Sequence, residues 1–334
     1  MERTVNWGIL GCGKIARKFA ADLKLVSGAR LLAVASRNKN NAENFAKDFE
    51  AQNVYDTYQG LVNDANVDVI YIATPHNLHF ENTLLCLNHD KAVLCEKPFA
   101  MNVNQVNKMI EVAKEKNIFL MEAMWSKFLP HYKKTMSLIQ DGKLGEISSV
   151  LINFGFKPKP PVAQRIYDPA LGGGTIMDIG IYNVFFALSI LGKPDEIEAS
   201  MVPYQSGVDE QCAVLFKYNN GKQAQLFSTF KANLPTDAEI CGSEGSLKLT
   251  TRFYEPSATI EYYTETIREK ETIQVEKQEG FGYRYEAQHV TECIQQGLKE
   301  SPIMSFQDSV LLMETLDAIR QKAGIHYPAD DILY

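Results

Sequence analysis

Apolar residues in the first part of the chain occur in short runs, and the stretches between them carry apolar side chains at every third or fourth position. Such runs predict strands of a parallel sheet covered on both faces, and such spacing predicts amphipathic helices. The pattern therefore predicts alternating strands and helices over residues 1–122. The expected strands are the run before Gly11, Leu31–Ala35, Val67–Ala73, Ala92–Cys95 and Phe119–Met121, and the expected helices include Asn41–Glu50, Glu81–Asn88 and Val103–Lys116.

The pattern changes in the second part of the chain, residues 123–334. Short strand-like segments follow one another there, separated by turn signals such as Asn219-Asn220-Gly221. We therefore expect an α+β domain with an open-faced, largely antiparallel sheet and helices on one face. The expected strands are Val150–Phe156, Ile197–Tyr204, Gln211–Tyr218, Gln223–Phe230, Ala238–Cys241, Ser246–Thr250 and Thr259–Tyr263, and the expected helices include His131–Asp141, Tyr285–Lys299 and Phe306–Lys322.

The predicted antiparallel sheet carries apolar side chains on both faces. Either Leu226 or Phe227, and either Leu215 or Phe216, must point away from the helices, because neighbouring residues of a strand face opposite sides. An apolar sheet face without covering helices indicates burial against another subunit. We therefore predict a homodimer, or a dimer of dimers, through this sheet.

The turn between the first strand and the first helix reads Gly11-Cys12-Gly13-Lys14-Ile15-Ala16. In a G-x-G-x-x-A turn the first glycine permits the tight bend, the second lets the backbone approach a pyrophosphate, and the small third residue packs the helix on the strand. An ordinary tight turn could carry the same residues, but both flanking strands and the helix lie within about thirty residues, which favours dinucleotide binding. The predicted contacts are Gly11, Gly13, Lys14, Ile15 and Ala16.

The end of the second strand indicates which dinucleotide is bound. Proteins specific for NAD place an acidic residue about 20 residues after the turn, where it binds the ribose 2′-hydroxyl. This chain has Ser36-Arg37-Asn38-Lys39 there. An arginine can bind a 2′-phosphate with its fork of donors, and serine and asparagine add neutral hydrogen bonds. Ser36, Arg37 and Asn38 therefore favour NADP, with NAD as the alternative.

Composition and charge exclude several classes of protein. The chain has 334 residues, 45% of them hydrophobic and 22% charged, as in an ordinary globular protein. Its net charge of −7 and the lack of a basic stripe argue against a nucleic-acid partner. The apolar runs are shorter than a membrane span and no signal-peptide pattern precedes the first strand, so we expect no membrane association and a cytoplasmic location.

Two of the predicted strands run into polar motifs. Thr74-Pro75-His76-Asn77-Leu78-His79 follows the third, and Glu96-Lys97-Pro98 follows the fourth. Open α/β sheets bind ligands at the carboxyl ends of their strands, which makes the motif residues candidate cofactor contacts. The two histidines lack a third nearby ligand, so we predict no metal site. Lys97 is interpreted either as part of a surface ion pair or as a catalytic lysine. The candidates are Thr74, Pro75, His76, His79, Glu96 and Lys97.

A glycine-rich loop, Gly172–Gly174, precedes a predicted helix that carries two titratable side chains. If this helix begins at Thr175, then Asp178 and Tyr182 share one face, as half of an active site would require. The alternatives are structural. The sequence from Thr175 to Asp178 also fits a capping box, and Tyr182 also fits a buried tyrosine with a satisfied hydroxyl.

Taken together, these motifs resemble the Gfo/Idh/MocA family of glucose-fructose oxidoreductase and inositol dehydrogenase. The resemblance covers nearly the whole chain. The runs Leu120–Trp125, Asp178–Tyr182 and Tyr285–Cys293 are most similar to the branch of the family that acts on dihydrodiols and D-xylose with NADP. The resemblance implies a nucleotide-binding Rossmann domain followed by an open-faced sheet domain that often forms oligomers.

The resemblance also implies roles for matched residues. Lys97 is expected beside the nicotinamide and the substrate oxygen, Tyr182 as the general acid or base, and Asp178 as the residue that orients the pair. Either Lys97 or Tyr182 takes the hydroxyl proton. Many family members have histidine at the position of Tyr182. The residues expected to contact the substrate are Trp125, Phe154, Arg165 and Phe281, although the loop 156–163 departs from the family pattern.

These expectations give a functional prediction. The chain is predicted to be an NADP-dependent oxidoreductase that transfers a hydride between nicotinamide and a hydroxyl of a D-xylose-like sugar or a trans-dihydrodiol. The alternatives are an NAD-dependent polyol or sugar dehydrogenase of the same family and a non-catalytic dinucleotide-binding sensor.

Overall fold

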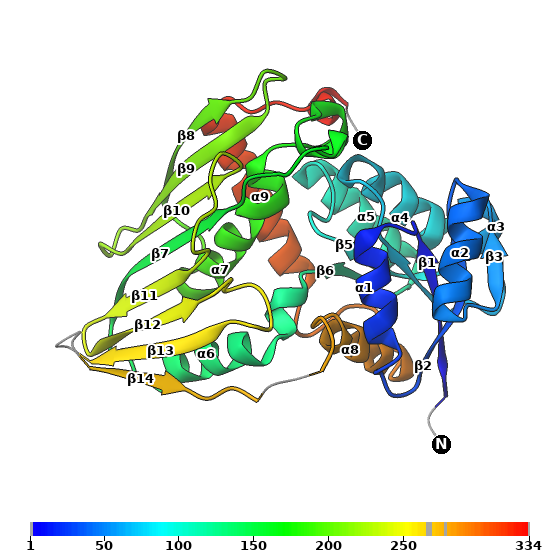
Figure 1. Ribbon diagram of the computed structural model, residues 1–334, viewed down its shortest axis with the longest axis horizontal. Coiled ribbons are helices and arrows are strands. Elements are labelled where there is room, and N and C mark those ends of the chain that lie inside the picture. The colour runs from blue at the N-terminus through cyan, green and yellow to red at the C-terminus, as the bar shows by residue number, and fades with distance from the viewer. Residues whose placement is uncertain (1–2, 265–268, 277–278, 333–334) are drawn as a thin grey trace. The chain divides into compact units, whose positions relative to one another are not determined.

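The computed structural model describes residues 3–264, 269–276 and 279–332. The chain divides into two compact units. Among the described residues, unit 1 contains 3–128 and 279–310, and unit 2 contains 129–264, 269–276 and 311–332. Helix α9 (Phe306–Ala323) crosses the division. The colours in Figure 1 allow the reader to follow both units along the chain.

Unit 1 is built on a parallel sheet of six strands in the order β3-β2-β1-β4-β5-β6. This order is that of a dinucleotide-binding Rossmann fold, and it reverses between β1 and β4, where such folds bind their ligands. The predicted α/β architecture is therefore confirmed. The strands are β1 (Val5–Leu10), β2 (Ala29–Ala35), β3 (Asn53–Tyr55), β4 (Val69–Ile72), β5 (Ala92–Glu96) and β6 (Leu120–Ala123).

The helices of unit 1 cover this sheet with their apolar faces. Helix α1, for example, buries Ala16, Phe19 and Leu23, which follow the spacing of three or four. Helix α8 comes from much later in the chain and packs against α1 and β1, where the Trp7 indole donates a hydrogen bond to Thr291 Oγ1 at 3.3 Å. The helices are α1 (Lys14–Leu23), α2 (Lys39–Phe49), α3 (Tyr58–Val62), α4 (His79–Asn88), α5 (Val103–Lys116) and α8 (Arg284–Gln295).

Unit 2 is built on an eight-stranded sheet in the order β14-β13-β12-β11-β7-β10-β9-β8. Neighbouring strands are antiparallel except for β7 and β10, which are parallel. The predicted, largely antiparallel sheet is confirmed. Its strands are β7 (Ile147–Gly155), β8 (Glu196–Pro203), β9 (Asp209–Lys217), β10 (Gln223–Thr229), β11 (Ala238–Gly242), β12 (Gly245–Thr250), β13 (Thr259–Thr264) and β14 (Lys270–Ile273), and its helices α6 (Pro130–Gln140) and α7 (Ile181–Leu191).

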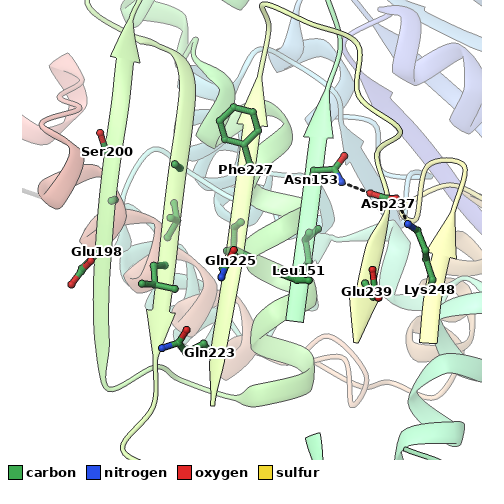
Figure 2. A pocket seen from close by; sticks show the side chains of 16 residues that line it. Leu151, Asn153, Glu198, Ser200, Gln223, Gln225, Phe227, Asp237, Glu239 and Lys248 are labelled. Atoms are coloured by element: carbon green, nitrogen blue, oxygen red, sulfur yellow. Dashed lines mark hydrogen bonds and ion pairs between the residues drawn. The ribbon is translucent and has the colours of Figure 1, made fainter. Parts of the chain in front are cut away.

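The two faces of this sheet differ in burial. Phe216 and Leu226 are 0% and 4% exposed and point into the core of unit 2, so Leu215 and Phe227 are the residues on the opposite face. That face holds a depression of about 760 Å³. Figure 2 shows Phe227 and Leu151 on neighbouring strands of this face, with polar side chains such as Gln225 and Asn153 beside them.

The segment Pro169–Leu191 is long and apolar enough to cross a membrane by length and composition. Within unit 2, however, 78% of its most apolar window is buried. The apolar character of this segment therefore fits a core helix, which is hydrophobic because it packs on the sheet.

Candidate active site

The turn after β1 leaves room for a phosphate group. Gly11 has a φ of +100°, and a Cβ added there would lie 2.8 Å from Ala73 O, so only glycine fits. A Cβ at Gly13 would meet nothing within 4 Å. Helix α1 has no side-chain cap at Gly13 and no acidic residue in its first turn. Its backbone N–H groups and positive helix end therefore suit a pyrophosphate.

The predicted 2′-phosphate residues lie together at the end of β2. Ser36 is buried, whereas Arg37 and Asn38 are exposed. Asn38 caps α2 by accepting a hydrogen bond from the Asn41 N–H at 3.1 Å, and its own N–H donates to Ser36 Oγ at 3.3 Å. Arg37 also hydrogen bonds to Tyr58. The first turn of α2 has no acidic residue, and residues 36–39 present only neutral or cationic side chains.

His79 connects the loops that follow β4 and β5. Its ring is fully buried, with Nδ1 2.7 Å from Pro98 O and Nε2 2.9 Å from Thr74 O. The histidine therefore fixes the backbone of both motifs named above, and Lys97 lies half-buried next to Pro98. His76 packs its ring 5.8 Å from that of His79. Direct contact of either histidine with a cofactor stays a prediction.

Buried acids lie behind the Lys97 loop. The Tyr71 hydroxyl donates a hydrogen bond to Glu96, and the Phe99 N–H donates to Glu122 Oε1 at 3.1 Å. Burial raises the pKa of Glu122 to about 7, although the Ser309 hydroxyl and the Phe99 N–H lower it. Burial, with Glu96 and Asp22 nearby, holds the pKa of Glu286 well above its usual range.

Unit 2 contributes Asp178 and Tyr182 from a helix that begins irregularly. Residues Ile176–Gly180 form a π-helical turn, here called the π-turn, and α7 continues from it. π-Helical turns occur frequently at functional sites. Asp178 is buried except for a small part and forms an ion pair with Arg165, whose Nη1 lies 3.2 Å from Asp178 Oδ2. The structure thus brings two predicted site residues, Arg165 and Asp178, into contact.

An aromatic group surrounds Tyr182. The Tyr254 ring lies 4.4 Å from the Phe154 ring and 4.8 Å from the Tyr182 ring. The sequence prediction included Phe154 but not Tyr254. Tyr254 lies in an irregular segment between two predicted strands, and an aromatic residue in such a loop is a usable signal for a binding site. Thr251 and Arg252 before it have φ values of 59° and 67°, which non-glycine residues adopt uncommonly.

The remaining predicted substrate residues belong to unit 1. Trp125 is 5% exposed and stacks on Tyr283 at 4.6 Å. Phe281 is 49% exposed, with the Lys18 ammonium 5.6 Å from its ring and its N–H donating to Asp22 Oδ1 at 2.7 Å. Phe281 therefore offers an accessible apolar surface, whereas Trp125 is almost fully buried. Their contact with substrate stays a prediction.

The described residues contain no group of three His, Cys, Asp or Glu side chains that could hold a metal ion. All six cysteines are free. Burial raises the pKa of Cys12, in the dinucleotide turn, to about 11, so this thiol is protonated at neutral pH. Among the candidate residues, the lysine, tyrosine and carboxyl groups can transfer protons, and a bound dinucleotide would supply hydride transfer.

Comparisons with known proteins identify relatives of this chain. Residues 5–124 match the model described as "Oxidoreductase family, NAD-binding Rossmann fold", and residues 132–248 match the GFO/IDH/MocA C-terminal domain. The chain is 36% identical to trans-1,2-dihydrobenzene-1,2-diol dehydrogenase of Xenopus tropicalis, over 97% of this chain and 99% of the relative. The same enzyme of Sus scrofa is 34% identical over 98% and 99%.

Solved structures give the same result. KijD10, a 3-ketoreductase from Actinomadura kijaniata in complex with NADP and TDP-benzene, is 26% identical with a TM-score of 0.86, covering 96% of this chain and 98% of that one. An aldose-aldose oxidoreductase from Caulobacter crescentus is 24% identical with a TM-score of 0.87 over the same shares, and this second likeness concerns the fold alone.

The raised pKa of Glu122 predicts a pH-dependent effect of the substitution Glu122→Gln. Because the folded pKa lies above the ordinary value of 4.5, the charged form costs stability as pH rises from about 4.5, and the full cost is present above about 7. Glutamine keeps an acceptor for the Phe99 N–H but never ionises. The variant should therefore gain stability relative to the wild type between pH 5 and pH 8.5, by up to roughly 3 kcal/mol.

Thermal unfolding at both pH values measures this gain. Glu115→Gln, on the exposed face of α5, is the matched control and should shift the two midpoints by the same small amount. A Glu122→Gln effect that does not change with pH would contradict the assignment.

Proposed function

The chain belongs to the Gfo/Idh/MocA oxidoreductase family, and within that family we propose that it is an NADP-dependent dehydrogenase of cyclic diols or sugars. The observation that carries this proposal is the aromatic group of Phe154, Tyr182 and Tyr254 beside the ion-paired Asp178. Aromatic rings pack well on a dihydrodiol ring or on the C–H face of a sugar. A tyrosine within this group places a titratable hydroxyl among the substrate-binding rings.

The relatives support the same substrate class. The relatives from Xenopus tropicalis and Sus scrofa are dehydrogenases of a trans-dihydrodiol, and the similarity covers 97% and 98% of this chain. KijD10 is a ketoreductase in complex with NADP. A D-xylose-like sugar is the second substrate candidate, because the polar pair Arg165 and Asp178 can hydrogen bond to additional hydroxyl groups.

The residues of unit 1 fit a dinucleotide phosphate. The open space at Gly13 and the uncapped start of α1 suit the pyrophosphate, and Ser36, Arg37 and Asn38 suit a 2′-phosphate. When bound, the nicotinamide supplies the hydride acceptor. An acidic residue that would bind the ribose 2′-hydroxyl of NAD is lacking at the end of β2, which supports NADP.

The catalytic residues divide the work of proton transfer. In this proposal Tyr182 removes the proton of the substrate hydroxyl, and the Lys97 ammonium stabilises the developing alkoxide and favours the ionised tyrosine. Asp178, held by Arg165 at 3.2 Å, orients the reacting hydroxyl. The reverse assignment, in which Lys97 takes the proton, predicts a different pH profile for the Tyr182→Phe variant.

The open face of the unit 2 sheet is the proposed dimer interface. Leu151 is 39% exposed there, and Leu215 and Phe227 are half-buried, while charged and amide side chains form the rim. Figure 2 shows Lys248 paired with Asp237 at one margin and Glu198 on β8 at the other. An apolar centre with a polar rim is typical of protein interfaces, and a second copy of this chain offers the same self-complementary face.

The proposed activity predicts reduction of NADP by the purified protein with a trans-dihydrodiol of an aromatic ring or with D-xylose. Lys97→Met and Tyr182→Phe should each lower kcat by roughly 100-fold or more, because each removes a group that acts on the reacting hydroxyl. Both should still bind NADP. Absorbance of the reduced cofactor measures turnover, and fluorescence titration measures binding.

Assays with further substrates, each with NADP and with NAD, also distinguish the alternative functions. Turnover with myo-inositol and NAD, but not with NADP, would instead support an NAD-dependent polyol dehydrogenase. Tight NADP binding without turnover on any substrate would support a sensor. Full activity in both folded variants would disprove the catalytic roles.

Cofactor choice should depend on Arg37. The substitution Arg37→Asp should raise the Kd for NADP by about 100-fold, since it removes a bidentate phosphate contact and adds a like charge, and it should change the Kd for NAD little. Arg30→Asp, near the other end of β2, makes the same change of charge and is the control. Equal losses of NADP and NAD affinity in the Arg37 variant would argue against a 2′-phosphate contact.

The dimer interface should be disrupted by Phe227→Glu. A carboxylate at the centre of the apolar face must be desolvated in the interface, which costs several kcal/mol and should produce monomers. Light scattering after size-exclusion chromatography measures the mass. Leu298→Glu, which changes an exposed leucine of unit 1, should leave the mass unchanged. A dimer that persists in the Phe227 variant would exclude this face.

A further inference from the structure

The π-turn that carries Asp178 is anchored by a buried aspartate outside the predicted site. Asp209, at the start of β9, is 0% exposed, and its Oδ2 accepts a hydrogen bond from the Ile176 N–H at 2.8 Å. The same oxygen accepts from the Thr175 hydroxyl. Thr175 Oγ1 also lies 2.9 Å from Ser228 Oγ on β10. Two strands of the sheet thus hold the first residues of the π-turn.

The glycine-rich loop is held against the same aspartate. Gly174 has a φ of +108°, and a Cβ added to it would lie 2.2 Å from Asp209 Oδ1 and 3.2 Å from the Tyr327 hydroxyl. Tyr327 is fully buried and donates a hydrogen bond to Gly173 O at 2.6 Å. The loop backbone is therefore enclosed between a carboxylate and a tyrosine that come from distant parts of the chain.

Tyr327 is itself held by Asp330, which forms an ion pair with Arg320. Arg320, on α9, is 3% exposed, and its Nη1 lies 2.8 Å from Asp330 Oδ2. Asp330 in turn accepts from the Tyr327 N–H at 3.0 Å. The segment after α9 is thereby tied to the glycine-rich loop by hydrogen bonds at both ends of Tyr327. The segment after α9 therefore lies where it can hold the glycine-rich loop in place.

Burial of the Asp209 carboxylate costs free energy of folding. Burial raises the pKa of Asp209 to about 6 against the lowering effect of Thr175 and Ile176, and Oδ1 has no hydrogen-bond partner among the described residues. A buried carboxylate of this kind lowers stability unless it satisfies other groups. Asp209 accepts hydrogen bonds from the backbone and side-chain donors at the start of the π-turn. The N–H groups of a first helical turn have no acceptor within the helix and need one from outside it.

We propose that Asp209 and Tyr327 are positioning residues, which fix the glycine-rich loop and the π-turn so that Asp178 and Tyr182 keep their reactive orientation. Asp209 acts two residues before Asp178, through the Ile176 N–H. Tyr327 acts through the Gly173 carbonyl. This inference rests on the catalytic roles proposed for Asp178 and Tyr182. It adds residues that touch neither substrate nor cofactor.

The test compares Asp209→Asn, Asp209→Ala and Tyr327→Phe in the full chain. Alanine removes the acceptor and should lower kcat by about 100-fold, because small displacements of reacting groups have effects of this size. Asparagine keeps an acceptor for the Ile176 N–H and should recover about 10-fold of that loss. Tyr327→Phe should lower kcat by about 10-fold. The Kd for NADP should stay unchanged in all three variants.

A matched control is available in the same unit. The Tyr218 hydroxyl donates to Gly192 O at 3.0 Å at the other end of α7, so Tyr218→Phe removes the same kind of bond away from the π-turn. It should leave kcat within about two-fold of the wild type, because it leaves the reacting groups in place. A loss of kcat equal to that of Tyr327→Phe would show a general loss of stability and would overturn the proposal, as would wild-type kcat in Asp209→Asn and Asp209→Ala alike.

Hydrogen exchange separates this inference from the proposed function. Amides of residues 172–182 should exchange faster in Asp209→Asn and Tyr327→Phe than in the wild type and Tyr218→Phe, while amides of unit 1 should not change. If the wild type lacks turnover on every substrate but this exchange difference appears, the proposed function fails and the anchoring contacts stand. Unchanged exchange in both variants would overturn the anchoring itself.

Discussion

The candidate site depends on buried side chains that hydrogen bond to the backbone of loops. A loop that leaves a sheet edge and turns inward exposes N–H and C=O groups that strands and helices cannot satisfy, and each such buried group costs free energy if it is left unpaired. In both units a fully or nearly fully buried polar side chain serves these groups. The pairs are His79 with Thr74 O and Pro98 O, Glu122 with the Phe99 N–H, Asp22 with the N–H groups of Phe281 and Arg284, and Asp209 with the Ile176 N–H.

This arrangement explains why buried acids with raised pKa values lie next to the backbone of loops. A carboxylate is a stronger acceptor for a backbone N–H than a neutral group, but its burial opposes ionisation. Glu122 and Asp209, with pKa values of about 7 and 6, lie near the point where the two effects balance. Glu286 lacks a hydrogen-bond partner for either carboxylate oxygen in the part of the chain that is described, and burial holds its pKa well above its usual range. Donors that meet a buried acid thus favour its charged form.

The elements that could be predicted from the sequence are those with a recognisable pattern of neighbouring residues. The G-x-G-x-x-A turn, the buried strands and the antiparallel segments each have a signature within a few residues, and the fold was predicted correctly from them. Tyr254 was missed because its proximity to Phe154 and Tyr182 depends on the loop after β12. A loop lacks the regular spacing of apolar residues that reveals a strand or a helix. The choice between Leu226 and Phe227 stayed open because a strand's alternation gives two sets of residues but not which set meets the helices. The π-turn, likewise, depends on contacts with β9 and β10 that are distant in sequence.

The two units differ in how they would recognise their ligands, and this difference bears on substrate choice. The dinucleotide turn uses backbone groups, helix ends and a steric need for glycine at Gly11, so few sequences satisfy it. The proposed substrate and catalytic residues are side chains from separate segments: Phe154 lies near the end of β7, Asp178 and Tyr182 lie on the π-turn and α7, and Tyr254 follows β12. A substitution at Phe154 or Tyr254 would change the rings proposed to contact the substrate without removing a proposed catalytic group. A family built in this way can keep one hydride chemistry while its members diverge in substrate.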